Sequence, residues 1–244
     1  MSDSDRPARG RPPGPARDFS ERRAEIVDVA ARTFAQNGYA GTGMSVLVEK
    51  SNLSGRGALY HYIGSKQELL VEIAFSVLTP LYENAALIAG LTAENPLTRL
   101  RLISETFLHT IAEKPSHVWV YEHDYRFLSD QHRDRFNAMR AQLEGVILGL
   151  VSEAIDEGVF VQVEPRLAVF AFFNLHNRTV QWFRQGGRWT AAYLSKTYCE
   201  ILFNGMRASS AAPVDVEGEL DTFRARHAGW PLAAPDVSAA EPVP

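Results

Sequence analysis

Residues 42–66 read TGMSVLVEKSNLSGRGALYHYIGSK, which is the pattern of two short helices joined by a tight turn. The pair Ser51-Asn52 is typical of such a turn, and Ser54 begins a second helix that continues through Tyr62. Thr42 is placed to cap the first helix. The apolar residues of that first helix follow helical spacing and are Met44, Leu47 and Val48. The stretch therefore predicts a helix–turn–helix unit.

The second helix of this unit opens with small and basic residues, namely Ser54, Gly55, Arg56, Gly57 and Ala58. Small side chains let a helix N-terminus enter the major groove of DNA closely, and the partial positive charge there favours phosphate. The guanidinium of Arg56 can donate two hydrogen bonds to a guanine edge. Further groups that can meet phosphates are those of Thr42, Tyr60, His61 and Lys66. The pattern indicates binding to double-stranded DNA.

Residues 38–70 resemble the tetracycline-repressor (TetR) family of bacterial transcription regulators, most specifically in GALYHY at 57–62 and in GSK and ELL within 64–70. The resemblance implies a homodimer that reads a pseudo-palindromic operator in successive major grooves, about 34–36 Å apart. It places the DNA contacts on Thr42, Ser54, Arg56, Gly57, Tyr60, His61 and Lys66. This chain has one residue more than the family pattern before GALY, so it stays open which of Ser54, Gly55 and Arg56 reads a base.

Charge is uneven along the chain, whose net charge is −4. The first 66 residues hold 10 basic and 7 acidic side chains, whereas the remainder holds 15 basic and 22 acidic ones. A basic first quarter favours contact with a polyanion at that end. Within it, Arg9-Gly10-Arg11-Pro12 looks like the core of an AT-hook, so Arg9 and Arg11 are candidates for the minor groove. The alternative is nonspecific attraction of this arm to phosphates.

Helical patterns continue along the whole chain, so we predict an all-α fold. The expected helices run from about Asp18 or Ser20 to Asn37, from Lys66 into the high eighties, from Asn95-Pro96 to Pro115, from Asp130 to Glu157, from Pro165 to Phe183 and from Thr190 to Met206. The chain then divides into four parts. These are a flexible basic arm at 1–20, a DNA-binding domain at 21–66, a ligand-binding and dimerisation domain at 67–207 and a weakly ordered acidic tail at 208–244, with a short helix around Glu217 to Arg226.

The resemblance implies that the last two helices of the body pair with their mates in a dimer. The expected interface residues are Val169, Phe172, His176, Val180, Leu194, Tyr198, Ile201 and Leu202. Aromatic side chains concentrate in the segments that line the ligand cavity of the family, which favours an apolar or amphipathic effector. The expected ligand-binding residues are Phe107, Trp119, Tyr121, Tyr125, Phe127, Phe173, Asn174, Asn177 and Trp182. Pairing of the polar ones with each other or with backbone is the alternative.

Three segments resemble more loosely the branch of the family that senses acyl-coenzyme A thioesters and represses lipid, sterol or aromatic-acid catabolism. They begin at Val118, Ala154 and Gln181. Three arginines could then meet a coenzyme A phosphate, although a solvated surface explains them equally, and these are Arg126, Arg133 and Arg140. The alternatives are a regulator that answers free drug-like hydrophobic compounds and a helical DNA-binding module without a ligand.

Other classes of protein are disfavoured by what the sequence lacks. It contains no His-Glu-x-x-His, Gly-x-Ser-x-Gly or phosphate-loop motif, so we expect no enzyme and no catalytic residues. The single cysteine, Cys199, excludes an intramolecular disulfide framework and suits a reducing cytoplasm. No apolar run approaches the length of a membrane span. We expect no cofactor and no metal, although His109, His117, His123 and His132 lie on neighbouring segments.

Overall fold

A computed structural model describes residues 19–208 and 214–227, and every regular element in these ranges is a helix. The helices are α1 (Phe19–Asn37), α2 (Met44–Lys50), α3 (Arg56–Tyr62), α4 (Lys66–Ala89), α5 (Pro96–Glu113), α6 (Pro115–His123), the 3₁₀ turn η1 (Tyr125–Phe127), α7 (Asp130–Asp156), α8 (Pro165–Trp182), α9 (Ala191–Met206) and α10 (Val216–Arg226). The prediction of an all-α fold is confirmed. The arm that carries Arg9 and Arg11 lies outside the described residues.

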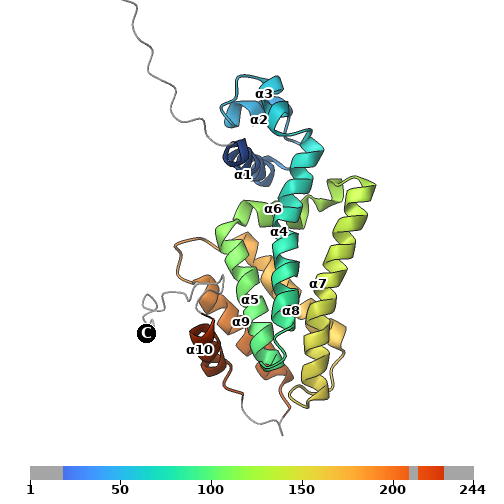
Figure 1. Ribbon diagram of the computed structural model, residues 1–244, viewed down its shortest axis with the longest axis vertical. Helices are drawn as coiled ribbons and strands as arrows, with labels where there is room; N and C mark the ends of the chain where they lie inside the picture. Colours follow the sequence, from blue (N-terminus) through green and yellow to red (C-terminus); the bar gives the residue numbers. More distant parts are fainter. Residues whose placement is uncertain (1–18, 209–213, 228–244) are drawn as a thin grey trace, which may run out of the picture.

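Helices α1, α2 and α3 form a small unit at one end of the molecule (Figure 1). The apolar stripe of α1 is buried as its spacing predicts, and it consists of Ile26, Val27, Ala30 and Phe34. Each of the two shorter helices contributes one fully buried leucine, Leu47 and Leu59. Helix α1 ends at Gly38, whose φ of 74° lies in the left-handed region that glycine adopts at little cost. A unit this small depends on these few apolar side chains for its stability.

Helix α4 joins this unit to the body. Its N-terminus has a capping box, because the Ser65 hydroxyl accepts from the Glu68 N–H at 3.0 Å and the Glu68 carboxylate accepts from the Gly64 N–H at 3.1 Å. By length and composition alone α4 would pass as a membrane-crossing helix. Its apolar residues, however, form core between the other helices, and the buried ones are Leu69, Leu70, Ile73, Ala74, Val77, Leu78, Leu81, Ala85 and Ile88. We therefore interpret α4 as a core helix.

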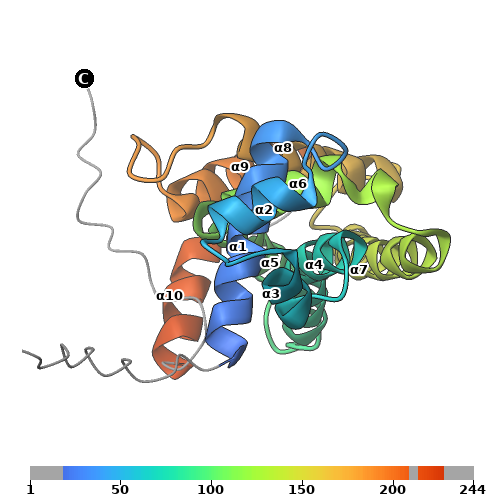
Figure 2. The same ribbon diagram turned by 90° about the horizontal axis from the view of Figure 1, so that it is seen from above.

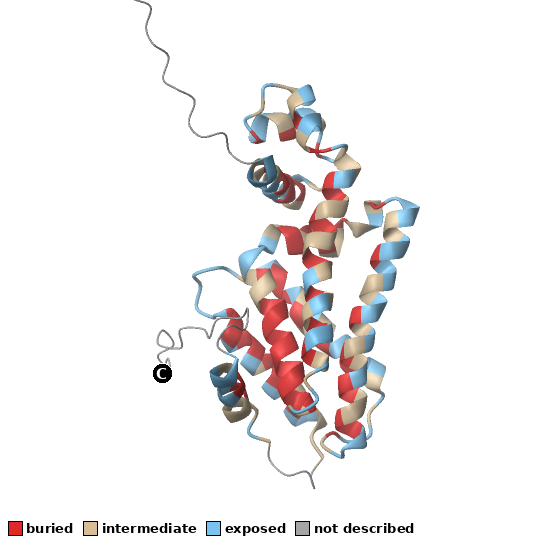
Figure 3. Ribbon diagram, viewed as in Figure 1, coloured by how far each residue is buried: buried red, intermediate tan, exposed pale blue. Residues whose placement is uncertain are grey.

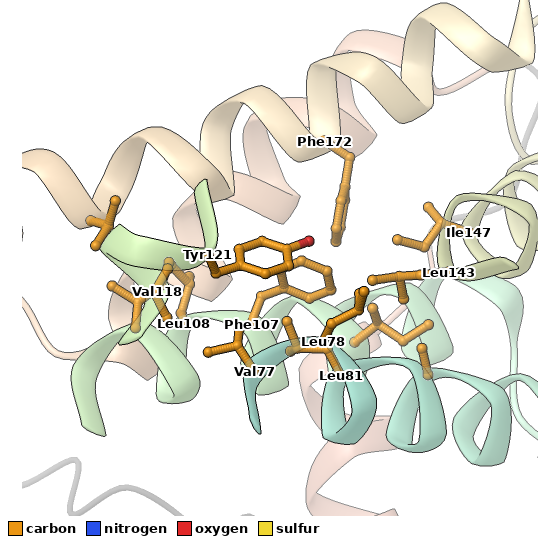
Figure 4. Packing of buried hydrophobic residues seen from close by; sticks show 14 of the residues in the cluster. Val77, Leu78, Leu81, Phe107, Leu108, Val118, Tyr121, Leu143, Ile147 and Phe172 are labelled. Atoms are coloured by element: carbon orange, nitrogen blue, oxygen red, sulfur yellow. The ribbon is translucent and has the colours of Figure 1, made fainter. Parts of the chain in front are cut away.

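The body is built around α5, which packs against α4, α7, α8 and α9 (Figures 1 and 2). All residues from Pro96 to Leu108 are buried, so α5 has no solvent-facing side over its first three turns (Figure 3). Asn95 caps this helix by accepting from the Leu97 N–H at 2.9 Å, with Pro96 at the first helical position, as the sequence predicts. Figure 4 shows side chains from α4 to α8 meeting in one apolar core.

The acidic segment after residue 208 contains a packed helix. Helix α10 confirms the short helix expected near Glu217 to Arg226, but it lies against α5 and is not a weakly ordered tail (Figure 1). Leu220 and Phe223 are fully buried there. They lie three residues apart and so share one face of α10, which the average composition of the segment conceals. This corrects the predicted domain boundary for residues 214–227.

Candidate DNA-binding and effector sites

The turn before α3 contains the extra residue. Asn52 adopts a left-handed φ of 50°, Ser54 and Gly55 follow in the turn, and Arg56 is the first residue of α3. Gly55 occupies the N-cap position of α3 and has no side chain that could accept a hydrogen bond. The first backbone N–H groups of α3 therefore have no side-chain acceptor from the cap. Arg56 therefore begins the helix and Ser54 belongs to the turn, while base reading by Arg56 stays a prediction.

One exposed surface collects most of the predicted DNA contacts. The exposed residues are Ser54, Arg56, Gly57, Tyr60 and His61, while Gly55 is half-buried. His61 is in addition packed edge-on against the ring of Phe19, at 5.5 Å between ring centroids. Leu59, on the opposite side of α3, is buried. The amphipathic phase of α3 therefore directs its polar residues outwards.

Thr42 and Lys66 do not share that surface, and this corrects their predicted roles. Thr42 is buried, its hydroxyl donates to the Gly38 carbonyl at 2.9 Å, and Gly43 takes the N-cap position of α2 instead. The Lys66 ammonium donates to the Tyr39 carbonyl at 2.5 Å and lies 4.1 Å from the centre of the Tyr39 ring. Burial lowers the pKa of Lys66, an effect that the nearby Asp124 carboxylate opposes. Sequence spacing placed both residues near DNA but could not show that their polar groups turn inwards.

Three contacts that the sequence did not reveal connect the DNA-binding unit to the body. The Tyr39 N–H donates to the Asp124 carboxylate at 3.2 Å, and the Tyr39 ring stacks on Phe127 with centroids 5.4 Å apart. On the other side of α6, His117 Nε2 lies 3.3 Å from the Asp28 carboxylate of α1. Burial lowers the pKa of His117, against the opposing pull of Asp28. No local pattern marks such pairs, because each joins residues about 85 positions apart in the chain.

The predicted ligand-binding aromatics are mostly core. Phe107 and Tyr121 are buried, and the Phe107 ring lies within 6 Å of the rings of Phe172, Phe173 and His176. Tyr125 stacks on Phe136, and Trp119 stacks on His123. Among the described residues these rings pack against one another, and a cavity lined chiefly by aromatic side chains stays a prediction. The aromatic rings are already in contact with one another, which satisfies them without a ligand.

A polar cleft lies beside these rings, between α6, α7 and α8. Its volume is about 420 Å³, within the range of small-molecule sites. The lining residues are Glu122, His123, Arg140, Glu144, Phe170, Phe173, Asn174, Asn177, Arg178 and Gln181. Of the residues predicted to bind ligand, Phe173, Asn174 and Asn177 line this cleft. Asn174 also donates its amide to the Phe170 carbonyl at 2.8 Å, the backbone pairing that the sequence left open.

The cleft contains one carboxylate with an unmatched oxygen. Glu122 Oε1 is buried and has no hydrogen-bond partner. Burial raises the pKa of Glu122, and the Arg140 guanidinium opposes that shift. Arg140 itself lies over the Tyr125 ring, 5.6 Å from its centre. A ligand that donates a hydrogen bond would satisfy Glu122, while Arg140 and Arg178 provide positive charge for an anionic group.

The predicted dimer interface is largely intramolecular core. The buried members are Val169, Phe172, His176, Val180, Leu194 and Tyr198, and Leu202 is half-buried. Ile201 alone of the predicted set is exposed, at 60%. Ile201 belongs to a group of exposed apolar side chains on α8, α9 and their connection, and the group consists of Leu167, Phe170, Trp182, Trp189, Tyr193 and Ile201. We call this set the α8–α9 face.

Metal binding finds no support within residues 19–208 and 214–227, where no group of three or more His, Cys, Asp or Glu side chains could hold an ion. The four histidines on neighbouring segments have separate partners. His117 pairs with Asp28, His109 lies 4.0 Å from Glu105, His123 stacks on Trp119, and His132 contacts Ser129.

Two family descriptions match the chain. "Bacterial regulatory proteins, tetR family" matches residues 26–73, which span the helix–turn–helix and the start of α4. "Tetracyclin repressor-like, C-terminal domain" matches residues 93–206, the body up to the end of α9. Together with the all-helical fold, these matches define a DNA-binding transcriptional regulator, and the chain belongs to the TetR family.

Similar proteins are named transcriptional repressors. KstR2 of Mycobacterium tuberculosis (strain ATCC 25618 / H37Rv) is 28% identical over 196 residues, covering 78% of this chain and 96% of the relative. AcnR of Corynebacterium jeikeium (strain K411) is 30% identical over 161 residues, covering 61% and 85%. The KstR2 structure has a TM-score of 0.72 at 25% identity and covers 77% and 96%. AibR in complex with isovaleryl coenzyme A and operator DNA has the same fold, with a TM-score of 0.66 at 23% identity over 75% and 98%.

Proposed function

We propose that the chain is a homodimeric repressor that leaves its operator when a small molecule binds the cleft between α6, α7 and α8. The observation that carries this proposal is that the polar residues at the start of α3 share one exposed surface at one end of the molecule. The body at the other end has an apolar, solvent-exposed α8–α9 face. The similar proteins named as repressors support the direction of the effect. Such a protein acts where the DNA is, in the bacterial cytoplasm.

DNA recognition is assigned to the α3 surface. Arg56 stands at the first position of α3 with an exposed guanidinium, which suits two hydrogen bonds to one guanine edge. Tyr60 lies one helical turn further on and offers its hydroxyl to a phosphate, as does the adjacent His61 with its imidazole. The uncapped N–H groups after Gly55 add a local positive field for the DNA backbone. We expect Ser54 and Gly57 to contact the backbone rather than a base.

Dimerisation is assigned to the α8–α9 face. Exposed apolar side chains concentrated on two neighbouring helices mark an association surface more often than chance exposure does. Among them Leu167 and Ile201 are the most exposed, at 65% and 60%. In a two-fold symmetric dimer through this face, each contact between the subunits occurs twice. The dimer then fixes the distance between the two copies of α3.

The effector is assigned to a thioester of coenzyme A. Arg140 and Arg178 line the cleft and suit phosphate groups. Phe173 also lines the cleft, and its ring contacts Phe107 of the aromatic core. An acyl group that enters beside Phe173 would displace packed side chains of that core. The AibR complex with isovaleryl coenzyme A provides support through a shared fold. Free drug-like hydrophobic compounds are the second candidate. The volume of about 420 Å³ favours a ligand-binding regulator over a module without a ligand.

Helix α6 is suited to transmit effector binding. Glu122 and His123, near its C-terminus, line the cleft, and Asp124 directly after it accepts from Tyr39. The first turn of α6 holds His117 against Asp28 of α1. A ligand that favours a shifted position of α6 therefore moves the DNA-binding unit as well as the start of α4. The ligand needs only a difference in affinity between the two positions.

The experiment is a titration of the full chain on DNA from upstream of its own gene, followed by fluorescence anisotropy. A panel of acyl-coenzyme A thioesters is compared with the matched free acids. We expect release by a thioester and not by its acid, and we expect the variant Arg140→Gln to bind DNA normally but resist release. Arg133→Gln, on the same helix but outside the cleft, is the control. Release by free acids alone would replace the thioester with the second candidate, and the absence of DNA binding would refute the repressor.

A further inference from the structure

Helix α10 lies beyond the residues that match the family, which end at 206, yet it is part of the folded body. Leu220 and Phe223 are fully buried against α5. Polar contacts add to this packing, since the Thr98 hydroxyl pairs with Glu219 and Arg226 donates to Glu94 at 2.9 Å. A helix attached this way covers the outer side of α5, which explains why α5 has no exposed face (Figure 3).

The side of α5 that α10 covers is charged. Arg101 and Glu105 lie one turn apart, their side chains are 3% and 1% exposed, and they pair with each other at 3.1 Å. Helix α10 supplies a second partner to each, because Glu217 lies 3.4 Å from Arg101, and Arg224 donates to both Glu105 oxygens at 2.8 and 2.9 Å. Buried charges are stable only when paired and hydrogen-bonded. The charges of Arg101, Glu105, Glu217 and Arg224 balance, and Asp221, on the exposed side of α10, lies 3.6 Å from Arg224.

The cluster continues into a one-way chain of hydrogen bonds that reaches α9 and α8. Arg101 donates to the Ser195 hydroxyl of α9 at 2.6 Å, and Ser195 donates to Ser104 of α5 at 2.8 Å. Ser104 contacts His176 Nε2 of α8 at 2.7 Å, and His176 Nδ1 contacts the Phe172 carbonyl at 2.7 Å. The Phe172 carbonyl only accepts, so a neutral His176 donates from Nδ1 and accepts at Nε2. Ser104 then donates to His176, and Ser195 donates to Ser104.

Arg101 is the link between α10 and α9. A groove of about 250 Å³ separates these two helices, and Arg101 lies in it together with side chains of both. Arg101 also donates to the Ala192 carbonyl at 3.4 Å, so it holds the N-terminal half of α9 at two points. Helix α10 places the Glu217 carboxylate 3.4 Å from Arg101 Nε, which is an ion pair without a hydrogen bond.

We propose that α10 is a positioning element for α8 and α9, and that its pairing with Arg101 and Glu105 fixes the geometry of the dimer and thereby the spacing of the two α3 helices on DNA. This inference rests on the proposed use of the α8–α9 face for dimerisation. Without α10, Arg101 and Glu105 are exposed to water, which competes for the hydrogen bonds that Arg101 gives to α9. The contact between α9 and α8 then loses its fixed geometry.

Two truncated chains form a matched pair for the test. A chain ending at His227 keeps α10, and a chain ending at Ala208 lacks it. Two point variants leave the apolar packing of α10 in place and change only its charge. Arg224→Gln removes the positive charge that α10 gives to Glu105, and Arg224→Lys keeps it. Ala225→Gln, on the exposed side of α10, is the control. The probes are DNA duplexes selected by the wild-type chain from a random library, together with versions whose half-sites are one base pair closer or further apart.

The wild-type chain is expected to be a dimer by light scattering and to prefer one half-site spacing. The chain ending at His227, Arg224→Lys and Ala225→Gln keep that preference. In the chain ending at Ala208 and in Arg224→Gln, the preference for one half-site spacing falls at least about tenfold. Both still bind a single half-site as the wild type does. An unchanged spacing preference in folded Arg224→Gln overturns the inference, even if its melting temperature falls, since α10 would then only stabilise the body. A monomeric wild type would instead refute the proposed dimer, and this inference with it.

Discussion

Acidification should destabilise this protein through one buried histidine. His176 is fully buried, and burial lowers its pKa from 6.5 to about 4, helped by the nearby positive charge of Arg101. The one-way hydrogen-bond chain acts in the same direction. A proton on Nε2 would face the Ser104 hydroxyl proton. Turning that hydroxyl round would point its proton at Ser195, whose own proton already occupies that hydrogen bond.

The magnitude follows from the two pKa values. Between pH 6.5 and pH 4 the unfolded chain binds a proton at this position and the folded chain does not, so stability falls as the pH falls. One pKa unit corresponds to about 1.4 kcal/mol, so the shift amounts to about 3 kcal/mol over this interval. Above pH 6.5 both states are neutral at His176, and this contribution is constant.

Urea unfolding at fixed protein concentration, at several pH values from 7.5 to 4.5, measures the effect. The variant His176→Gln keeps an acceptor for Ser104 but cannot titrate, and His176→Asn is a second choice if the first packs poorly. We expect the difference in unfolding free energy between wild type and variant to shrink by about 2.5 kcal/mol as the pH falls from 7.5 to 4.5, most of it below pH 6.5. If the difference in unfolding free energy stays constant with pH, His176 is not a neutral side chain that accepts from Ser104.

Three further predictions concern the proposed function. Arg56→Ala should weaken binding to the selected operator by about 1–3 kcal/mol and relax the preference for one base, measured by anisotropy on single-base operator variants; an unchanged preference would remove Arg56 from base reading. Ile201→Glu should convert the dimer to monomer in light scattering at micromolar concentration, because it places a charge in an apolar contact, whereas Lys196→Glu on the same helix serves as the control. Asp124→Ala removes the acceptor of the Tyr39 N–H, so the ratio of operator affinities without and with thioester should fall at least about fivefold; full release in this variant would exclude the contact from coupling.

Local signals in the sequence were sufficient for most helices. Ser65 and Asn95 cap α4 and α5, and such caps can be predicted because an N-cap depends on neighbours two or three residues away. Gly158 ends α7 with a φ of 72°, again a local requirement. The exposed residues at the start of α3 were equally predictable, since the amphipathic phase of one short helix decides them.

Sequence could not predict which of two apolar stripes faces which neighbour. Val169 and Phe172 face the core while Leu167 and Phe170 face solvent, although all four are hydrophobic and lie on one helix. Hydrophobicity shows that a side chain is stabilised by burial, not whether the same chain or a second copy covers it.

Direction of polar groups was also beyond the sequence. Thr42 and Lys66 lie next to the DNA-binding helices, but Thr42 donates to Gly38 and Lys66 to Tyr39, both backbone carbonyls inside the unit. The same holds for Arg101 and Glu105 on α5, whose burial depends on α10 more than one hundred positions away. Such contacts are decided by the tertiary arrangement.

The length of α4 sets how small a movement of the body is needed to disturb DNA binding. Its 24 residues, at 1.5 Å each, make a rod about 36 Å long that holds Pro80 in its interior, and three residues join its N-terminus to α3. Pivoting such a rod by about 5° at its far end displaces the near end by about 3 Å, close to the 3.4 Å that separates successive base pairs. A rotation of α4 by only a few degrees in the body would therefore shift α3 by about one base-pair step at the operator.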